Sequence, residues 1–492
     1  MRGASSSLRC CLVAATVRAL APPPGSLAPP PGPSLLRSFV GIGLDGSPWQ
    51  FMLTLKREGY DGATRVPLGP AGDYYFLLSP ESVKRVVLED AESYPRRFSV
   101  PLFRTLDLDR GIVYEQGERH RSQKRRCIPA FENSASMASF LAAFDEEAAA
   151  LAAGWRAACD RDGGSTRLDL YAETRSLTLR VVLRVTFGLD ARTSDYENAE
   201  ELSTIIGDYL EAIVATANEI PPLWQVYPPL SANYVRVTET LLPRLRFLVN
   251  DLIAYRRREL DDDGAAARSS DLLSILARDA TLEDADILYI LFDLIIAGSD
   301  TTASTIAAAL FVLHEPRHAA ALDAARAEAA TLGDDLALDA VRDELPYHTG
   351  VAREVLRLFP PVPFIGRTSV RETDLGGAVP EGATMCWSPW FLGRDPAAWG
   401  SDAAEFRPAR WLDDPVTGGA PTTFSWLPFG AGPRGCLGTR LGLTESIVGT
   451  ARILRDFDLA FDRAGEELSF KYDLTLNLGA STTCTVSPRR RV

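Results

Sequence analysis

The chain has 492 residues, of which 46% are hydrophobic and 24% are charged, a composition typical of globular proteins. Its formal net charge of −13 argues against a nucleic-acid-binding protein, which needs a basic surface. The seven cysteines show no Cys-x-x-Cys spacing and the four histidines form no cluster. Neither a disulfide framework nor a zinc site is therefore indicated.

Residues 1–44 contain no Asp or Glu, but they carry four arginines, three consecutive serines and seven prolines between Pro22 and Pro33. This composition is typical of an organelle transit segment, and it favours a plastid over a mitochondrion or the cytoplasm. A disordered, proline-rich tail is the alternative. The apolar stretch 10–17 has about half the length that a bilayer requires, so we expect no transmembrane anchor. Residues 45–492 are expected to form a single domain.

The pattern of that domain predicts a mainly α-helical protein with small β-sheets. A β-hairpin is expected over Thr64–Leu68 and Tyr74–Leu78, followed by a helix that begins at Pro80, because strands alternate apolar and polar residues and proline favours the first helical turn. Alanine-rich amphipathic stretches predict four further helices. They cover residues 134–159, 170–188, 196–217 and 234–260, and the segment 458–488 alternates as strands do.

The segment Gly117–Phe131, GERHRSQKRRCIPAF, carries a local concentration of positive charge in an acidic chain. Its cluster consists of Arg119, Arg121, Lys124, Arg125 and Arg126. Such a cluster can attract an acidic partner protein. A solvated helix face without a partner explains it equally well.

A long apolar helical pattern runs from Ile287 to Leu313 and is interrupted by a polar notch, GSDTT, at residues 298–302. Glycine and adjacent threonines are poor choices inside a helix, so the notch can open the backbone hydrogen-bond ladder. The alternative is a buried polar patch whose hydroxyl groups bond to carbonyls one turn earlier.

Two segments before the C-terminus are linked by charge. Glu354 and Arg357 lie three residues apart on one predicted helix face, where they can pair, and the later segment FRPARW supplies Phe406, Pro408 and Arg410. A surface pair at this spacing contributes only a few tenths of a kcal/mol. We therefore interpret the pair as structural, holding the chain behind the loop that follows.

That loop, FGAGPRGCLG at Phe429–Gly438, carries the clearest chemical signal. Its glycines let the backbone approach a flat ligand closely, and Arg434 offers a two-pronged cation suited to a carboxylate such as a haem propionate. Cys436 lies just before an apolar helical run, whose N-terminus favours a thiolate. A glycine-rich turn with a buried structural cysteine is the alternative.

The pattern Phe-x-x-Gly-x-Arg-x-Cys-x-Gly in this loop resembles the cysteine-loop signature of the cytochrome P450 superfamily. The resemblance implies the triangular-prism P450 fold, with haem b between the long central helix and the cysteine-loop helix. It further implies that Cys436 is the axial iron ligand and that Phe429 and Gly438 frame the haem. Glu354, Arg357 and Arg410 would form the family's structural triad, with Ala409 in place of the usual acid.

The same resemblance assigns roles in the remaining segments. Asp300 and Thr301 correspond to the acid–alcohol pair that relays protons. The propionate positions of the family fall on His120, Lys124, Arg367 and Arg434. His120 and Lys124 depart from the usual Trp and Arg. The imidazole of His120 replaces the indole as a hydrogen-bond donor, and the ammonium group of Lys124 replaces the bidentate guanidinium group with a point charge.

Asp293 is named by no motif, but it lies seven residues before Asp300, within about 20° of the same helix stripe. It interrupts the apolar run LFDLII, where an unpaired carboxylate would be costly. We expect it at the substrate cavity with Ala297, facing the roof formed by residues 205–245. Its carboxylate would either tie the helix to that roof or contact the substrate directly.

The implied activity is that of a haem-thiolate monooxygenase, RH + O2 + 2 e− + 2 H+ giving ROH + H2O. The partners would be a small apolar substrate, O2 and an electron donor, either ferredoxin or an NADPH-dependent reductase. We expect a monomer that can touch a membrane peripherally. A weaker resemblance to plastid carotenoid-ring hydroxylases covers residues 176–257 and the C-terminal segment DLTLNLGASTTCTVSPRR. Fatty-acid or sterol oxidation, a haem-thiolate isomerase or dehydratase acting on hydroperoxides, and a non-catalytic haem sensor are the alternatives.

Overall fold

The structure is a computed structural model that describes residues 28–489. The segments it leaves undescribed within that range are 70–71, 98–100, 191–193, 220, 262–269, 334–336, 413–423, 464–470, 474 and 479–481. The predicted targeting leader therefore lies outside the described residues as far as residue 27.

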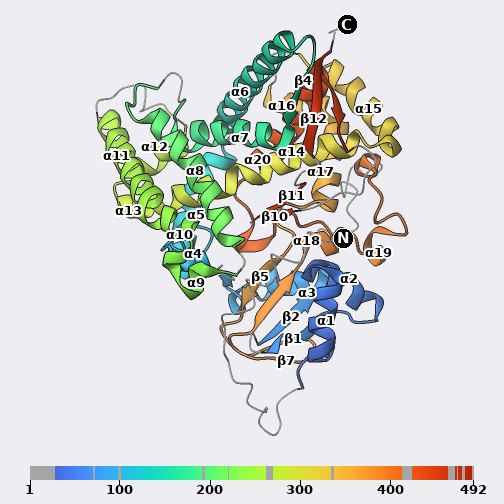
Figure 1. Cartoon of the computed structure of the whole chain (residues 1–492). Coiled ribbons are helices and arrows are strands. Elements are labelled where there is room, and N and C mark those ends of the chain that lie inside the picture. Colours follow the sequence, from blue (N-terminus) through green and yellow to red (C-terminus); the bar gives the residue numbers. More distant parts are fainter. Residues whose placement is uncertain are drawn as a thin grey trace.

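Helices make up most of the described chain, as the sequence pattern predicts (Figure 1). Those before the central helix are α1 (Leu35–Asp45), α2 (Pro48–Arg57), α3 (Pro80–Lys84), α4 (Pro101–Thr105), α5 (Gly117–Glu132), α6 (Ser134–Arg161), α7 (Leu170–Phe187), α8 (Ala199–Ala217), α9 (Leu223–Val226), α10 (Ala232–Arg236), α11 (Leu242–Asp261) and α12 (Leu272–Ala277). Those that follow are α13 (Asp284–Gly298), α14 (Asp300–Leu313), α15 (Ala319–Ala330), α16 (Leu338–Glu344), α17 (Pro346–Leu358), α18 (Pro389–Leu392), α19 (Pro396–Trp399) and α20 (Thr439–Asp456).

Twelve short strands are seen in the described chain. They are β1 (Ala63–Pro67), β2 (Asp73–Leu77), β3 (Arg96–Arg97), β4 (Thr166–Asp169), β5 (Ile365–Thr368), β6 (Thr373–Asp374), β7 (Ala378–Val379), β8 (Thr384–Trp387), β9 (Phe457–Phe461), β10 (Lys471–Asp473), β11 (Thr475–Asn477) and β12 (Thr483–Pro488). The largest sheet has the order β1-β2-β8-β5-β3 and includes the predicted hairpin; β4-β12-β9 form a second sheet. In Figure 1 the large sheet, covered by α1–α3, forms the lower end of the molecule, below the helical mass.

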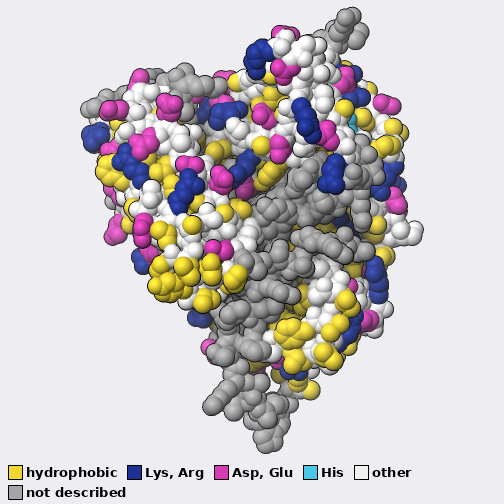
Figure 2. All heavy atoms as spheres, viewed as in Figure 1, with side chains coloured by type: hydrophobic (Ala, Val, Ile, Leu, Met, Phe, Trp, Pro, Cys, Tyr) yellow, Lys and Arg dark blue, Asp and Glu magenta, His cyan; other side chains and the backbone are white. Residues whose placement is uncertain are grey.

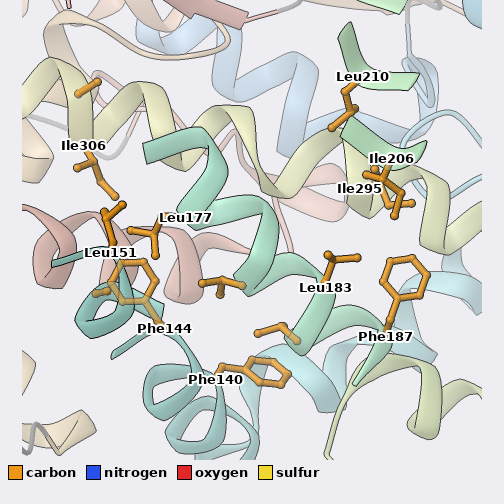
Figure 3. Close-up of a cluster of buried hydrophobic side chains, with 14 of the residues drawn as sticks. Phe140, Phe144, Leu151, Leu177, Leu183, Phe187, Ile206, Leu210, Ile295 and Ile306 are labelled. Atoms are coloured by element: carbon orange, nitrogen blue, oxygen red, sulfur yellow. The ribbon is translucent and has the colours of Figure 1, made fainter. Parts of the chain in front are cut away.

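The central helix determines where the site can lie. It runs as α13 and α14 with an interruption at Ser299, and α14 packs against α7 and α20. The apolar face of α7 interdigitates with neighbouring helices through Leu177, Leu183 and Phe187, which Figure 3 shows among buried side chains of α6, α8, α13 and α14. Burying each such side chain contributes about 1.5–3 kcal/mol, so this packing fixes the position of α13 and α14.

Two groups of large apolar side chains remain exposed. The first lies on α1 and comprises Leu35, Leu36, Phe39, Val40 and Leu44. The second begins at the last residue of α9 and comprises Val226, Tyr227 and Leu230. Figure 2 shows hydrophobic patches over both regions on the same face of the molecule. The continuous stretch Asp284–Leu313 is long and apolar enough to cross a bilayer, but 78% of its most apolar window is buried within the fold, as expected of a core helix.

Candidate active site

The cysteine loop is held by backbone contacts that require its glycines. The N–H of Cys436 donates to the carbonyl of Phe429 over 2.9 Å, which closes the loop just before α20 begins. Gly432 has φ = 67°, and a Cβ at this position would lie 2.1 Å from the carbonyl oxygen of Val87. Only glycine meets both conditions. The loop is thereby pressed against the helical segment after α3.

The Cys436 side chain is exposed by surface area, yet the surrounding protein raises the pKa of its thiol through burial. Both observations hold when a sulfur faces a hollow inside the molecule. The N–H of Gly438 and the charges of Arg97 and Lys124 lower that pKa, as a thiolate site requires, but burial outweighs them. The N–H of Gly438 at the start of α20 thus acts in the direction that the sequence predicts, and burial acts against it. A bound metal cation would supply the missing stabilisation.

Two arginines lie opposite each other in the large sheet next to this hollow. Arg97 of β3 is the register partner of Arg367 of β5, and like charges directly opposite destabilise a sheet. Arg97 also donates to the backbone carbonyl of Arg434 over 2.7 Å, while Arg434 donates to the carbonyl of Pro95 over 3.1 Å. Burial lowers the pKa of all three guanidinium groups, and their mutual repulsion lowers those of Arg367 and Arg434 further.

His120 and Lys124 of α5 complete this cation cradle, which we define as Arg97, His120, Lys124, Arg367 and Arg434. Burial and the four neighbouring cations lower the pKa of His120 to about 3, so its imidazole is neutral near pH 7. Lys124 donates to the carbonyls of Pro433 and Gly435 over 2.8 and 2.9 Å. Its ammonium group thus holds the cysteine loop as well as adding charge to the cradle.

The cradle fits a ligand with two carboxylates. The Nε of Arg97 and an Nη of Arg434 are buried and have no hydrogen-bond acceptor, which is costly for a charged donor. Two acids partly offset these charges. Asp293 raises the pKa of Arg97 and Glu115 raises the pKa of Arg434, but in both cases burial lowers the pKa by more. Haem b carries two propionates, so the donors present suit it, beside a cysteine that faces the same hollow.

The predicted notch in the central helix is a real interruption. Ser299 separates α13 from α14, and its carbonyl accepts a hydrogen bond from the hydroxyl of Thr178 in α7 over 2.9 Å. Gly298 is required by packing, since a Cβ there would lie 2.7 Å from a methyl group of Val182. Ala297 is exposed and Thr301 half-buried, although the helix around them is buried. A Cβ at Gly442 would lie 3.6 Å from the hydroxyl of Thr302 and 4.0 Å from the ring of Phe429, so the notch adjoins the cysteine loop, and we infer that its open face borders the hollow.

Three of the four polar side chains of the notch, those of residues 300–302, point in different directions. The hydroxyl of Thr301 donates to the carbonyl of Ala297 over 2.8 Å on the open face. Asp300 is buried and forms an ion pair with Arg175 of α7 over 2.7 Å. Thr302 donates to Glu445 of α20 over 3.2 Å, and burial raises the pKa of that glutamate to about 8. Of the two threonines, Thr301 is therefore the one placed at the hollow.

Asp293 is buried, but its partner differs from the predicted one. Its carboxylate accepts a hydrogen bond from the N–H of Val113 over 2.6 Å, so it binds the segment before α5 and not the 205–245 roof. Burial raises its pKa to about 7, against the Val113 hydrogen bond and the charge of Arg97. Its exposed fraction is 5%, which leaves little room for direct substrate contact, whereas Ala297 one turn later is open to the hollow.

The predicted charge triad is assembled and buried. Arg357 binds Glu354 through two hydrogen bonds of 2.8 and 2.6 Å, and Arg410 reaches the same carboxylate at 3.4 Å. Trp411 also donates to Glu354 over 2.9 Å. Asp402 pairs with Arg410 at 3.0 Å. It therefore provides an acidic partner for this arginine, although Ala409 stands where the family usually has an acid. The triad joins α17 to the chain that leads into the cysteine loop.

Most of the basic cluster on α5 is engaged in ion pairs. Arg119 pairs with Asp286, Arg121 with Glu118 and Arg126 with Asp279. Arg125 is exposed. Only part of the predicted cluster is thus available to a partner on this surface. Arg440, at the start of α20, is also exposed and adds a second cation there.

Sequence reasoning missed three of these residues. Arg97 belongs to the cradle only because sheet register sets it opposite Arg367. Arg175 and Glu445 reach the notch from helices 125 and 143 residues away. An isolated acid within the apolar run after Gly442 was a signal for Glu445, as the similar interruption was for Asp293; nothing in the local sequence marks Arg97 or Arg175.

Comparison with known proteins agrees with this architecture. The sequence profile of the cytochrome P450 family matches residues 28–479. The chain is 32% identical over 430 residues to cyclooctat-9-en-7-ol 5-monooxygenase of Streptomyces melanosporofaciens, covering 82% of this chain and 84% of that protein. It therefore belongs to the cytochrome P450 family, and it is a monooxygenase of that family.

Two further relatives show the range of similar proteins. Cyclooctatin synthase of the same Streptomyces species is 32% identical over 416 residues, covering 82% of this chain and 84% of the relative. Protein LUTEIN DEFICIENT 5, chloroplastic, of Arabidopsis thaliana is 26% identical over 450 residues, covering 88% of this chain and 73% of the relative.

Proposed function

We propose that residues 45–492 form one catalytic domain that binds haem b and hydroxylates an apolar terpenoid or carotenoid-like substrate. The observation that carries this proposal is the cation cradle beside Cys436, in a chain whose central helix is interrupted at Ser299. Cys436 would ligate the iron, Arg97, His120, Arg367 and Arg434 would hold the propionates, and Phe429 and Gly438 would border the ring. When bound, a haem with thiolate ligation supplies the iron chemistry that cleaves O2.

The residues of the notch supply the proton path. Thr301 presents its hydroxyl at the hollow, and Asp300 behind it is held by Arg175. When the ion pair loosens, the Asp300 carboxylate can take up a proton from solvent, because Arg175 is partly exposed, and release it toward the hollow on the side of Thr301. An enzyme that rearranges hydroperoxides needs no such path, so this arrangement favours oxygen insertion over the isomerase or dehydratase alternative.

The substrate class is inferred from relatives and from the site. The names of two relatives refer to cyclooctat-9-en-7-ol and to cyclooctatin, and that of a third refers to lutein; these are cyclic, largely apolar molecules. Ala297 adds a small, exposed apolar side chain on the open face of the central helix. We therefore place a cyclic terpenoid or a carotenoid ahead of a linear fatty acid.

Electrons would arrive at the surface formed by α5 and α20. Arg125 and Arg440 are exposed there, and Arg440 also donates to the carbonyl of Glu132 at the end of α5 over 3.3 Å. A cationic surface on an acidic chain suits an acidic donor such as ferredoxin or the flavin domain of a reductase.

We infer a plastid location and a monomer that touches a membrane through its exposed apolar residues. The acid-free leader and the chloroplastic relative support the location. The exposed apolar patches on α1 and after α9 lie on one face (Figure 2). Such patches favour contact with a lipid surface from which an apolar substrate could enter.

The test is a spectral titration of the haem-loaded full chain with a panel of cyclic terpenoids, carotenoids, fatty acids and sterols. Binding of a substrate in the hollow should shift the haem spin state, and the binding compounds should gain one oxygen when reduced donor and O2 are supplied. Cys436→His is the control: it should retain haem but lose the red-shifted carbon-monoxide band, whereas Cys386→Ala, a buried cysteine of β8, should keep it. An unchanged band in Cys436→His would overturn the assignment.

A further inference from the structure

The segment between α4 and α5 is docked on the central helix by two side chains that lie one helical turn apart. We define this segment, residues 106–116, as the 106–116 loop. At its start, Tyr289 donates its hydroxyl to the carboxylate of Asp107 over 2.7 Å. Near its end, the N–H of Val113 donates to the carboxylate of Asp293 over 2.6 Å. Because residues four apart share a helix face, α13 holds both ends of the loop with one stripe.

The backbone of the loop is shaped for this contact. Asp107 has φ = 55°, the only positive φ of a non-glycine residue in the described chain. Gly111 approaches the helix so closely that a Cβ would lie 2.3 Å from the Asp293 carboxylate and 2.5 Å from the carbonyl oxygen of Tyr289. A sparsely populated backbone conformation persists only where its surroundings hold it, so the two side chains and the close approach act together.

The opposite side of the loop reaches the candidate site. Burial lowers the pKa of Arg97 in the cradle, and interaction with Tyr114 at the end of the loop offsets part of that change, which places Tyr114 near the cradle. On the helix, the stripe that begins with Tyr289 and Asp293 continues to Ala297, which is open to the hollow. The loop therefore lies between α13 and the cation cradle, beside the helix stripe that leads to the exposed Ala297.

We propose that Tyr289 and Asp293 are positioning residues for substrate selection, because they hold the 106–116 loop against α13 and thereby set the size of ligand that the hollow accepts. Neither side chain touches the substrate. Asp293 is buried against Val113, and the Tyr289 hydroxyl is bound to Asp107. The proposal relies on the proposed function only in placing the substrate in this hollow.

Three variants of the haem-loaded full chain test the proposal. Tyr289→Phe removes one hydroxyl, Asp293→Ala removes the acceptor, and Asp293→Asn keeps an acceptor oxygen. Tyr255→Phe is the matched control, since its hydroxyl binds Glu259 within α11 over 2.8 Å. The first readout is hydrogen–deuterium exchange of peptides that cover residues 106–116. The second is the ratio of affinities for two iron-binding probes of different bulk, N-tritylimidazole and imidazole.

Tyr289→Phe and Asp293→Ala should speed exchange in the 106–116 loop about threefold to tenfold, the effect of losing one net hydrogen bond. The affinity ratio of the two probes should change by a similar factor, while Asp293→Asn and Tyr255→Phe stay near the wild type in both readouts. Unchanged exchange would overturn the docking, and faster exchange with an unchanged affinity ratio would overturn the role in selection.

If Asp293→Ala fails to retain haem, Tyr289→Phe still tests the proposal, because it removes only a hydroxyl group whose acceptor, Asp107, is half-buried. Neither readout uses turnover or a natural substrate. A failure here therefore leaves the proposed hydroxylation untouched, and a failure of hydroxylation leaves these measurements interpretable.

Discussion

Glu445 shows how a single residue can depend on the whole fold for its charge. It lies in α20, nine residues after Cys436, and is buried against α14 where Thr302 donates to it. Gly442 and Gly449 on the same helix allow the close approach; a Cβ at Gly449 would lie 2.8 Å from a methyl group of Ile306. In this dry contact burial raises the pKa of Glu445 to about 8, so the carboxyl is mostly protonated at neutral pH.

We predict that Glu445→Gln makes the stability of the protein less dependent on pH. The folded pKa, about 8, is raised above the ordinary value of 4.5. The neutral carboxyl therefore contributes stability that is fully present below about pH 4.5 and is lost as pH rises through 8. Denaturant midpoints at pH 5.5, 7 and 8.5 measure this. The wild type should lose more stability over the series than Glu445→Gln, and equal slopes would contradict the prediction.

At the scale of elements, α17 depends on a buried ion pair for its position. Glu354 and Arg357 have completely buried side chains, and they are further bound by Arg410 and by the indole of Trp411. A buried pair contributes little net stability, but removing one partner leaves an uncompensated charge. The pair therefore acts as a lock between α17 and the segment that enters the cysteine loop.

Either Glu354→Ala or Arg357→Ala should leave the protein without stable haem, because each strands a buried charge at a cost of about 3–5 kcal/mol. Haem content after purification, relative to protein, measures this. Arg121→Ala is a matched control: Arg121 and Glu118 form an i,i+3 pair on α5 with side chains 62% and 70% exposed, and such a pair contributes about 0–1 kcal/mol. Normal haem content in both triad variants would show that the lock is dispensable.

At the scale of the whole molecule, charge is distributed unevenly. The chain is acidic overall, with a net charge of −13, while cations collect in the buried cradle and on the nearby surface of α5 and α20. Ion pairs to Asp286 and Asp279 engage Arg119 and Arg126. The long-range attraction of a negatively charged donor would thus depend mainly on Arg125 and Arg440, which are exposed.

Reversing both charges, Arg125→Glu with Arg440→Glu, should slow reduction by an acidic donor and flatten its dependence on ionic strength, since steering is screened by salt. Stopped-flow reduction with ferredoxin between low and high salt measures this, and the probe-binding spectra should not change. Arg258→Glu, an exposed arginine of α11, is the control. If the double variant is reduced at the same rate and with the same salt dependence as the wild type, this surface is only a solvated face.

The helices show what the sequence pattern could predict. The helical stretches 134–159, 170–188 and 234–260 were predicted close to α6, α7 and the α10–α11 region, because their apolar periodicity and caps are local properties. The capping side chain of Asp169 at the start of α7 and the left-handed Gly188 at its end are examples.

The sequence by itself determined the cysteine loop, the interrupted central helix and the Glu354–Arg357 pair, because each depends on residues a few positions apart. Only the tertiary structure decided which partners these groups meet. Arg97 joins the cradle through sheet register, Asp300 and Thr302 meet side chains 125 and 143 residues away, and Asp293 binds an N–H that is 180 residues away instead of the predicted roof. Such contacts follow from helix rotation and strand register, which the packing of the whole core sets.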